Sequence, residues 1–237
     1  MFVAEAEGLN AIAATHTIRV PTPITYGVAA QQSYLVLEHL ELSSRGSAKL
    51  LGEHIAALHR CVSPQFGFAQ NNFIGTTPQP NGWKDSWIEF WREQRLGFQL
   101  QLAAANGYGG QLQILGKKLM GALPAFFADY TPHPSLLHGD LWSGNHAFLA
   151  DGTPTIFDPA TYYGDREADL AMTELFGGYS AEFYAAYRRA YSLHDGYELR
   201  RDLYNLYHIL NHANLFGGGY ARQAEQMMQR LLAEVEG

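Results

Sequence analysis

Apolar residues near the start of the chain form short continuous runs, and later they recur at helical spacing. This change predicts a small strand-containing part before a longer helical part. Met1 to Ala14 is rich in Ala, Glu and Leu, which favour a helix. Two strands, Ile24–Val28 and Ser33–Glu38, are expected on either side of a polar turn. The unbroken apolar run of residues 34–37 predicts that the second strand is buried.

Most of the remaining chain has the apolar spacing of amphipathic helices. Helices are predicted for residues 47–60, 83–102, 111–130, 166–176, 181–191, 197–216 and 221–236. The stretch from Ser63 to Gly82 is rich in Gly, Pro, Asn and Phe, so we expect an irregular binding loop there. Asp151-Gly152, between two apolar triplets, predicts a β-hairpin. The predicted fold class is therefore α+β.

Composition narrows the classes of function that the chain can have. Hydrophobic residues make up 47% and charged residues 16%, which indicates a folded protein rather than a disordered one. The net charge of −7 disfavours nucleic acid as a partner. Cys61 is the only cysteine, which is typical of a reducing compartment. Because the sequence has neither an 18-residue apolar run nor a signal-peptide pattern, we expect a cytoplasmic protein without membrane partners.

The strongest chemical signal is the segment from His138 to Asn145, followed by Asp158 after an apolar pair. Phosphoryl transfer needs a carboxylate that accepts a hydroxyl proton and hard oxygen ligands for Mg²⁺. Asp140 can be the base, while Asn145 and Asp158 can offer an amide and a carboxylate oxygen to the metal. The predicted hairpin would bring the two metal ligands side by side. The alternative is that these residues form an ordinary turn and that Asp158 caps a helix.

This order of residues resembles that of protein kinases, in which a catalytic loop precedes a metal-binding Asp. Gly139 replaces the usual Arg, and Asp158-Pro159-Ala160 replaces Asp-Phe-Gly, as in the aminoglycoside and choline kinases. With further motifs the chain resembles the fructosamine-3-kinase family over nearly its whole length. These motifs are His138–Asn145, Phe157–Ala160 with Tyr163-Gly164, Leu175–Gly178, Asn211–Asn214, Phe66–Phe68, Asn81–Trp83, and Trp87 with Phe90.

The resemblance implies a protein-kinase-like fold and a function. Members of the family use ATP and Mg²⁺ to phosphorylate the 3-hydroxyl of ketosamines, which are sugar–amine adducts that also form on lysines. The phosphorylated adduct falls apart, so the family is associated with protein deglycation. Two other functions stay open on the sequence: a kinase of another small alcohol, such as an aminoglycoside or choline, and a non-catalytic protein that binds sugar–amines.

The resemblance also implies roles for nucleotide-site residues. In a hinge, the Glu38 carbonyl and the Leu40 N–H would pair with adenine. Glu5 matches the helix glutamate that pairs with a phosphate-gripping lysine, but the first lysine here is Lys49, beyond the hinge. We therefore expect residues 1–40 to be a truncated N-terminal lobe with exposed apolar strand surface, and residues 41–237 to be the catalytic and substrate-binding lobe. The natural protein is longer, or this is a short form with weak or no kinase activity.

Two supporting residues and one substrate residue complete the implied site. Asp169 would brace the catalytic loop by accepting hydrogen bonds from backbone N–H groups, with support from His138; alternatively, Asp169 is a favourable acid at a helix N-terminus. The implied substrate site lies between the catalytic loop and the aromatic region from Ser63 to Phe90. Trp142 would stack on the sugar–amine there or form one side of its site. The alternative for Trp83, Trp87 and Trp91 is helix packing, which we expect for at least one of them.

Overall fold

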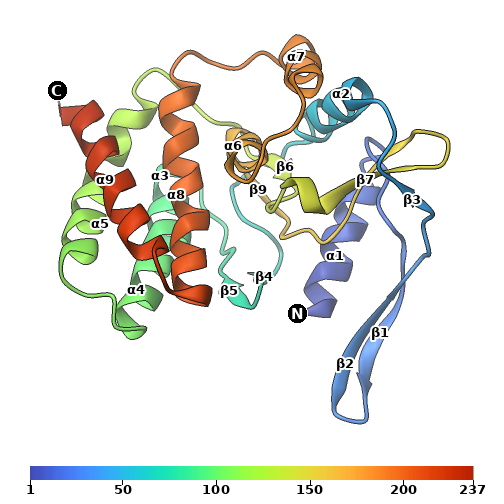
Figure 1. Cartoon of the computed structure of the whole chain (residues 1–237), viewed down its shortest axis with the longest axis horizontal. Helices are drawn as coiled ribbons and strands as arrows, with labels where there is room; N and C mark the ends of the chain where they lie inside the picture. The colour runs from blue at the N-terminus through green and yellow to red at the C-terminus, as the bar shows by residue number, and fades with distance from the viewer. Residues whose placement is uncertain (237) are drawn as a thin grey trace.

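The computed structural model describes residues 1–236 and shows helices around small antiparallel sheets (Figure 1). The helices are α1 Phe2–Ala13, α2 Ala48–Leu58, α3 Trp87–Phe90, α4 Phe98–Ala105, α5 Gln111–Ala122, α6 Glu167–Leu175, α7 Ala181–Ala190, α8 Tyr197–Phe216 and α9 Tyr220–Glu236. The strands are β1 Pro23–Ala29, β2 Gln32–Leu37, β3 Leu42–Ser43, β4 Asn72–Ile74, β5 Thr77–Gln79, β6 Ser135–Leu137, β7 His146–Leu149, β8 Pro154–Ile156 and β9 Tyr162–Gly164. The α+β prediction is confirmed.

The strands form four separate sheets. They pair as β1–β2, β3–β7–β8, β4–β5 and β6–β9, and every pair is antiparallel. The β7–β8 hairpin is the one that Asp151-Gly152 predicts, with Gly152 at φ +84°. Its turn closes with a hydrogen bond from Leu149 N–H to the Thr153 carbonyl, 2.8 Å.

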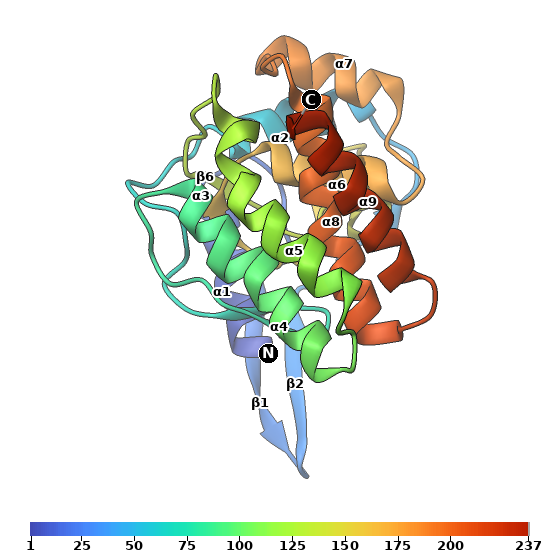
Figure 2. The same ribbon diagram turned by 90° about the vertical axis from the view of Figure 1, so that its left-hand side faces the viewer.

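Helices α4, α5, α8 and α9 pack side by side (Figure 2). On the other side α2 packs against α7, and α6 packs against α8. Trp87, Phe90 and Trp91 are buried and pack against Tyr204 and neighbouring rings. The packing alternative for at least one tryptophan is therefore confirmed.

Two predicted helices have other bounds in the structure, for local reasons. The helix expected from residue 83 begins at Trp87, because Ser86 caps it and Lys84 forms backbone hydrogen bonds with Phe66 instead. A π-helical segment, Trp91–Gly97, then joins α3 to α4. The helix expected to reach residue 130 ends at Ala122, because a 3₁₀ turn with a proline, Leu123–Phe127, follows.

The β1–β2 hairpin projects away from the helices, as both views show (Figures 1 and 2). Its apolar side chains are exposed, among them Ile24 (66%), Val28 (72%) and Val36 (42%). The prediction of a buried strand at residues 34–37 is therefore wrong, because β2 pairs only with β1 in the part of the chain that the structure describes. The expectation of exposed apolar strand surface is confirmed.

The stretch from Ser63 to Gly82 is more regular than expected. Strands β4 and β5 form a tight hairpin within it, with Ile74 opposite Thr77. Gly75 has φ +60° at this turn, a conformation that glycine adopts without strain. The prediction of a wholly irregular loop is wrong, because the turn glycine and buried amide groups order the segment.

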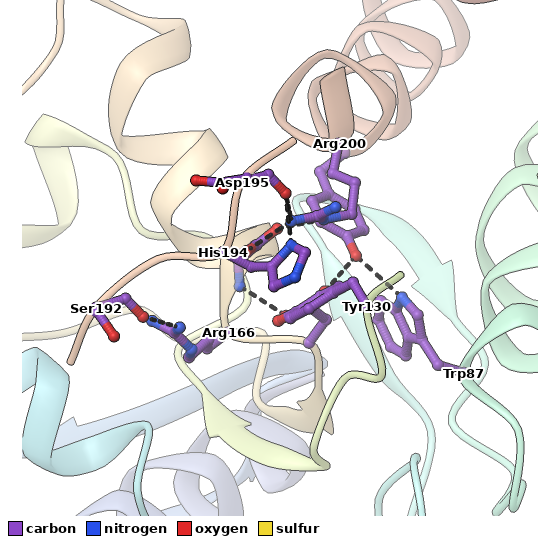
Figure 3. Close-up of polar contacts among 10 residues, drawn as sticks. Trp87, Tyr130, Arg166, Ser192, His194, Asp195 and Arg200 are labelled. Carbon is purple, nitrogen blue, oxygen red and sulfur yellow. Dashed lines mark hydrogen bonds and ion pairs between the residues drawn. The ribbon is translucent and has the colours of Figure 1, made fainter. Parts of the chain in front are cut away.

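A buried polar cluster ties the start of α6 to α8 (Figure 3). Asp165 accepts hydrogen bonds from the hydroxyls of Tyr130, 2.9 Å, and Tyr204, 2.5 Å. The Tyr204 hydroxyl also accepts one from Trp87 Nε1, 3.0 Å. Because these groups have little access to water, the hydrogen bonds hold α6 in one position against α8.

Across residues 1–236, the structure contains no helix with the length and apolar character that a membrane crossing requires.

Candidate active site

The catalytic-loop residues and the metal-binding candidates lie together. Strand β6 leads into the loop at residue 138, and the β7–β8 hairpin returns the chain to Asp158. The Asn145 amide nitrogen donates to the Asp140 carbonyl, 2.9 Å, and to the Asp140 carboxylate, 3.3 Å. It also lies 3.5 Å from the Asp158 carbonyl. The Asn145 carbonyl accepts a hydrogen bond from Phe157 N–H, 3.1 Å, which joins the two ends of the hairpin.

A pocket of about 300 Å³ opens beside these residues. Asp140 and Asp158 line it together with Glu5, so three carboxyl groups share one pocket. The start of α1 forms one wall, and the β4–β5 hairpin forms another through Asn72, Phe73, Gly75 and Thr76. The segment between Ser63 and Gly82 therefore contributes directly to the candidate site.

Two unusual backbone conformations shape this pocket. Gly139 has φ +84°, and a Cβ there would lie 2.1 Å from the Ala160 carbonyl oxygen. No residue with a side chain fits this approach, which explains glycine in place of the arginine of protein kinases. Asp158 itself has φ +57°, a strained conformation for a residue with a Cβ and one often found at functional sites.

Asp169, in the first turn of α6, contacts the backbone of the catalytic loop. Its carboxylate accepts hydrogen bonds from the backbone N–H groups of His138, 2.7 Å, and Gly139, 2.8 Å. His59 Nε2 lies 3.2 Å from the same carboxylate, and His59 Nδ1 lies 2.8 Å from the Tyr187 hydroxyl. Asp169 is buried, so these contacts hold the loop at a fixed place relative to α2, α6 and α7.

His138 links Asp140 to the strand that precedes Asp158. Its Nδ1 accepts a hydrogen bond from the Asp140 N–H, 3.2 Å, and its Nε2 lies 3.0 Å from the Phe157 carbonyl. Burial lowers the pKa of His138, so the ring is neutral and donates through Nε2. The geometry leaves the Asp140 carboxylate on the pocket side of the loop.

Electrostatic repulsion among the acids makes the pocket a candidate cation site. Burial, Asp158 and Asp169 together raise the pKa of Asp140 to about 7. Burial and Asp158 also raise the pKa of Glu5. For Asp169 burial acts in the same direction, but the hydrogen bond and charge of His59 outweigh it and lower the pKa. A positive ion in the pocket would relieve the repulsion on Asp140 and Glu5.

The available ligand atoms are oxygens, which fits Mg²⁺. Asp158 and Asn145 offer a carboxylate and an amide oxygen. In the described range, no three His, Cys, Asp or Glu side chains form a closed metal cage. Two such protein groups suit a nucleotide-bound Mg²⁺, since phosphate and water supply the other ligands of the ion in sites of this kind.

Neither Trp142 nor Trp83 lines the pocket, although Phe73 of the aromatic region does. Trp142 is 38% exposed, its ring covers Gly144, and its carbonyl accepts a hydrogen bond from the Tyr179 hydroxyl, 3.1 Å. Trp83 is 43% exposed and lies beside Tyr163, with ring centres 6.2 Å apart. The residues that line the pocket do not include either tryptophan. Contact between Trp142 and a sugar–amine therefore stays a prediction.

The hinge candidates lie at the end of the exposed hairpin. The Glu38 side chain pairs with Arg19 and accepts from Thr22 N–H, 3.1 Å, and these contacts lower its pKa to about 2. Its backbone N–H donates to the Thr22 carbonyl, 2.8 Å. Among the hydrogen bonds of residues 1–236, none involves the Glu38 carbonyl or the Leu40 N–H. Both groups are therefore available for hydrogen bonds to a nucleotide base.

Several residues around the site have no role that the sequence predicted. Asn72, Gln79 and Asn81 are buried next to the Asp158 loop, and His59 supports Asp169. The available signal was the density of amide side chains between residues 70 and 81, in a segment otherwise rich in Gly and Pro. Amides at such density in an apolar setting indicate a buried hydrogen-bond network.

Replacing Asp140 with Asn is expected to stabilise the metal-free protein. The pKa of Asp140 is about 7 in the folded protein, so folding disfavours its ionised carboxylate. In the unfolded chain the same group ionises above about pH 4. The gain in the free energy of unfolding is therefore absent at pH 3.5, grows as the pH rises to 7 and is constant above, at about 4 kcal/mol for a shift of about three pKa units. Urea unfolding in EDTA at pH 5 and pH 8 measures it. Equal stability of both proteins at pH 8 would contradict the prediction.

Comparisons with known proteins agree with this geometry. The family model for fructosamine kinase matches residues 1–234. A Synechocystis protein named “Probable ketoamine kinase” is 53% identical, and the match covers 98% of this chain and 79% of the relative. The chloroplastic protein-ribulosamine 3-kinase of Arabidopsis thaliana is 44% identical, with 98% and 72% covered.

Solved structures give the same result for the fold. A crystal structure from Haemophilus somnus, of a protein assigned as a fructosamine-3-kinase, superposes with a TM-score of 0.89 at 32% identity, covering 98% of this chain and 79% of that one. An ADP-bound aminoglycoside phosphotransferase has a TM-score of 0.62 at 9% identity over 97% of this chain and 83% of that one, which shows the fold alone. The predicted protein-kinase-like fold is confirmed, and the chain belongs to the fructosamine kinase family.

Proposed function

We propose that this protein transfers a phosphoryl group from ATP to the 3-hydroxyl of ketosamines. The observation that carries the proposal is the single pocket that Asp140, Asp158 and Glu5 share, with Asn145 hydrogen-bonded to Asp140, in a member of the fructosamine kinase family. The named relatives act on ketoamines and protein-bound ribulosamines, which are substrates of one chemical class. Release of the phosphorylated adduct would link the protein to deglycation.

Asp140 is the group that can accept the hydroxyl proton. Burial and Asp158 raise the pKa of Asp140 to about 7 without a cation, and a metal ion on Asp158 would lower it, so the carboxylate would be ionised and able to accept a proton at neutral pH. The Asn145 amide holds the carboxylate through the 3.3 Å hydrogen bond, so the accepting oxygen has a fixed direction. Asp140 therefore orients the sugar hydroxyl and removes its proton as the phosphoryl group arrives.

The nucleotide side of the pocket has its own groups. Asp158 and Asn145 would hold Mg²⁺, which offsets the charge of the phosphate oxygens when it is bound. The free Glu38 carbonyl and Leu40 N–H would pair with adenine, and Glu5 borders the phosphate region. On this proposal residues 1–40 belong to the nucleotide-binding lobe and residues 41–237 to the catalytic and substrate-binding lobe. The cytoplasmic location stays a prediction from the sequence.

Substrate choice tests the proposed function directly. ADP formation is measured with ribulosyl-lysine, fructosyl-lysine, an aminoglycoside and choline, each with ATP and Mg²⁺. We expect kcat/KM for one of the ketosamines to exceed that for the other alcohols at least about tenfold, because a site that hydrogen-bonds its own substrate rejects analogues that leave polar groups unpaired. Turnover of choline or the aminoglycoside but not of ketosamines would favour the other kinase class. Ketosamine binding without ADP formation would favour a binding protein.

A further inference from the structure

The loop that carries Asp158 has little regular structure of its own. Residues 157–161 lie between β8 and β9, and Asp158 adopts the strained φ of +57°. Two backbone hydrogen bonds tie the loop to the catalytic loop, from Phe157 N–H to the Asn145 carbonyl at 3.1 Å and from Ala160 N–H to the His138 carbonyl at 2.9 Å. On the side away from the catalytic loop, side chains of another segment hold the loop in position.

Two buried amides of the β4–β5 hairpin hold it. Gln79 Nε2 donates to the Ala160 carbonyl, 3.0 Å, and Asn72 Nδ2 donates to the Thr161 carbonyl, 2.8 Å. Gln79 Nε2 also donates to Asn72 Oδ1, 2.8 Å, which joins the two amides. The two carbonyls that they fix belong to the second and third residues after Asp158.

The direction of these hydrogen bonds is set by groups deeper in the core. Arg95, which can only donate, gives a hydrogen bond to Asn81 Oδ1, 2.8 Å, so Asn81 Nδ2 must face Asn72 Oδ1, 2.8 Å. The Tyr207 hydroxyl donates to Gln79 Oε1, 2.7 Å. Asn72 and Gln79 therefore each present the amide nitrogen to the Asp158 loop. The reverse orientation would place an amide oxygen against a carbonyl oxygen of the loop.

Burial makes this arrangement rigid. The amides of Asn72, Gln79 and Asn81 and the Arg95 guanidinium are buried, and the guanidinium lies between the rings of Phe90, 4.5 Å, and Tyr162, 4.0 Å. Water has little access to replace a broken hydrogen bond here, so each lost bond leaves an unpaired polar group. The loop therefore has one preferred position while the chain of hydrogen bonds is intact.

We propose that Asn72 and Gln79 are positioning residues for the metal-binding Asp158. They act through the carbonyls of Ala160 and Thr161, and Arg95 and Tyr207 orient them. The proposal rests on the proposed function in one respect, the role of Asp158 as a ligand of the nucleotide-bound metal. The same hairpin lines the pocket that holds Asp140, so on this proposal it helps to set the distance between the metal ligand and the general base.

Mn²⁺ binding in the presence of ADP, followed by electron paramagnetic resonance, tests this without any ketosamine. Gln79→Met removes the amide and keeps the side-chain length, and we expect Mn²⁺ affinity to fall about tenfold, as for other groups that orient a metal ligand. Gln113→Met is the matched control, since Gln113 Nε2 also makes two hydrogen bonds, to the Leu100 and Tyr108 carbonyls, far from the pocket. The control should stay within twofold of the wild type.

If Gln79→Met does not fold, a less disruptive variant and its control test the same proposal. Tyr207→Phe removes only the hydroxyl that orients Gln79, and we expect Mn²⁺ affinity to fall roughly threefold. Tyr197→Phe removes a hydroxyl that donates to Glu174 from the same helix, and should leave affinity unchanged. Wild-type affinity in folded Gln79→Met or in Tyr207→Phe, or no Mn²⁺ binding by the wild type, would overturn the proposal.

This test separates the inference from the proposed function. If the wild type binds Mn²⁺–ADP but phosphorylates no ketosamine, the substrate assignment fails while the comparison of variants still decides on Asn72 and Gln79. If ketosamine is phosphorylated and the Gln79 and Tyr207 variants bind Mn²⁺ as the wild type does, the inference alone fails.

Discussion

Asp140→Ala is expected to lower kcat with a ketosamine about 10²- to 10⁴-fold, the range for losing a positioned general base. The carboxylate lies in the pocket with Asp158, and Asn145 fixes its direction. Without it, the sugar hydroxyl has neither a proton acceptor nor a group that aligns it with the phosphate. The KM for ATP should change much less, because the hinge groups and the side chains of the metal ligands are retained. Steady-state ADP release against ketosamine and against ATP concentration measures kcat and this KM.

The control for this variant is Asp151→Ala. Asp151 is an exposed aspartate at the tip of the β7–β8 hairpin, where it accepts a hydrogen bond from Thr153 N–H, 2.9 Å. It lies in the same sequence region as Asp140 but outside the pocket, so kcat should remain within about twofold of the wild type. Turnover by Asp140→Ala equal to that of the control would remove Asp140 from the mechanism.

The elements that local signals determine could be predicted from the sequence. The β7–β8 hairpin depends on its own Asp-Gly turn, and α8 has the predicted bounds of residues 197–216 because its apolar spacing is regular. The convergence of Asn145 with Asp158 follows from that hairpin. The convergence of Asp140, Asn145 and Asp158 could therefore be predicted, because these residues lie within about twenty residues of sequence.

The predictions that were wrong concern features that depend on contacts between distant segments. The helix start at Trp87 depends on the pairing of Lys84 with Phe66, and the exposure of β2 depends on which strands lie beside it. The amides that hold the Asp158 loop bridge 81 residues, from Gln79 to Ala160, and 128 residues, from Gln79 to Tyr207. Such pairs leave no periodic signal in the sequence, because each depends on the fold that brings its partners together.

Arg200→Met is expected to lower the free energy of unfolding by about 3–5 kcal/mol, the cost of breaking a buried ion pair. Arg200 Nε lies 2.7 Å from Glu167 Oε2, and the side chains are 4% and 0% exposed. Figure 3 shows the Arg200 side chain beside Tyr130, and its guanidinium lies 4.1 Å from the centre of that ring. Its removal leaves the Glu167 carboxylate buried close to Asp165 without a positive partner. Urea unfolding at pH 8 measures the loss.

The pH dependence identifies the unpaired charge as the cause. Burial and Asp165 raise the pKa of Glu167 to about 7, and the loss of Arg200 raises it further. At pH 5.5 the variant can keep Glu167 protonated, so its deficit should be smaller than at pH 8. The neighbouring Arg201→Met, whose ion pair with Glu174 is partly exposed, should cost less than about 1 kcal/mol. Adding Glu167→Gln to Arg200→Met removes the buried charge, so it should restore part of the stability at pH 8. A deficit that is equal at both pH values and unaffected by Glu167→Gln would assign the loss to packing instead.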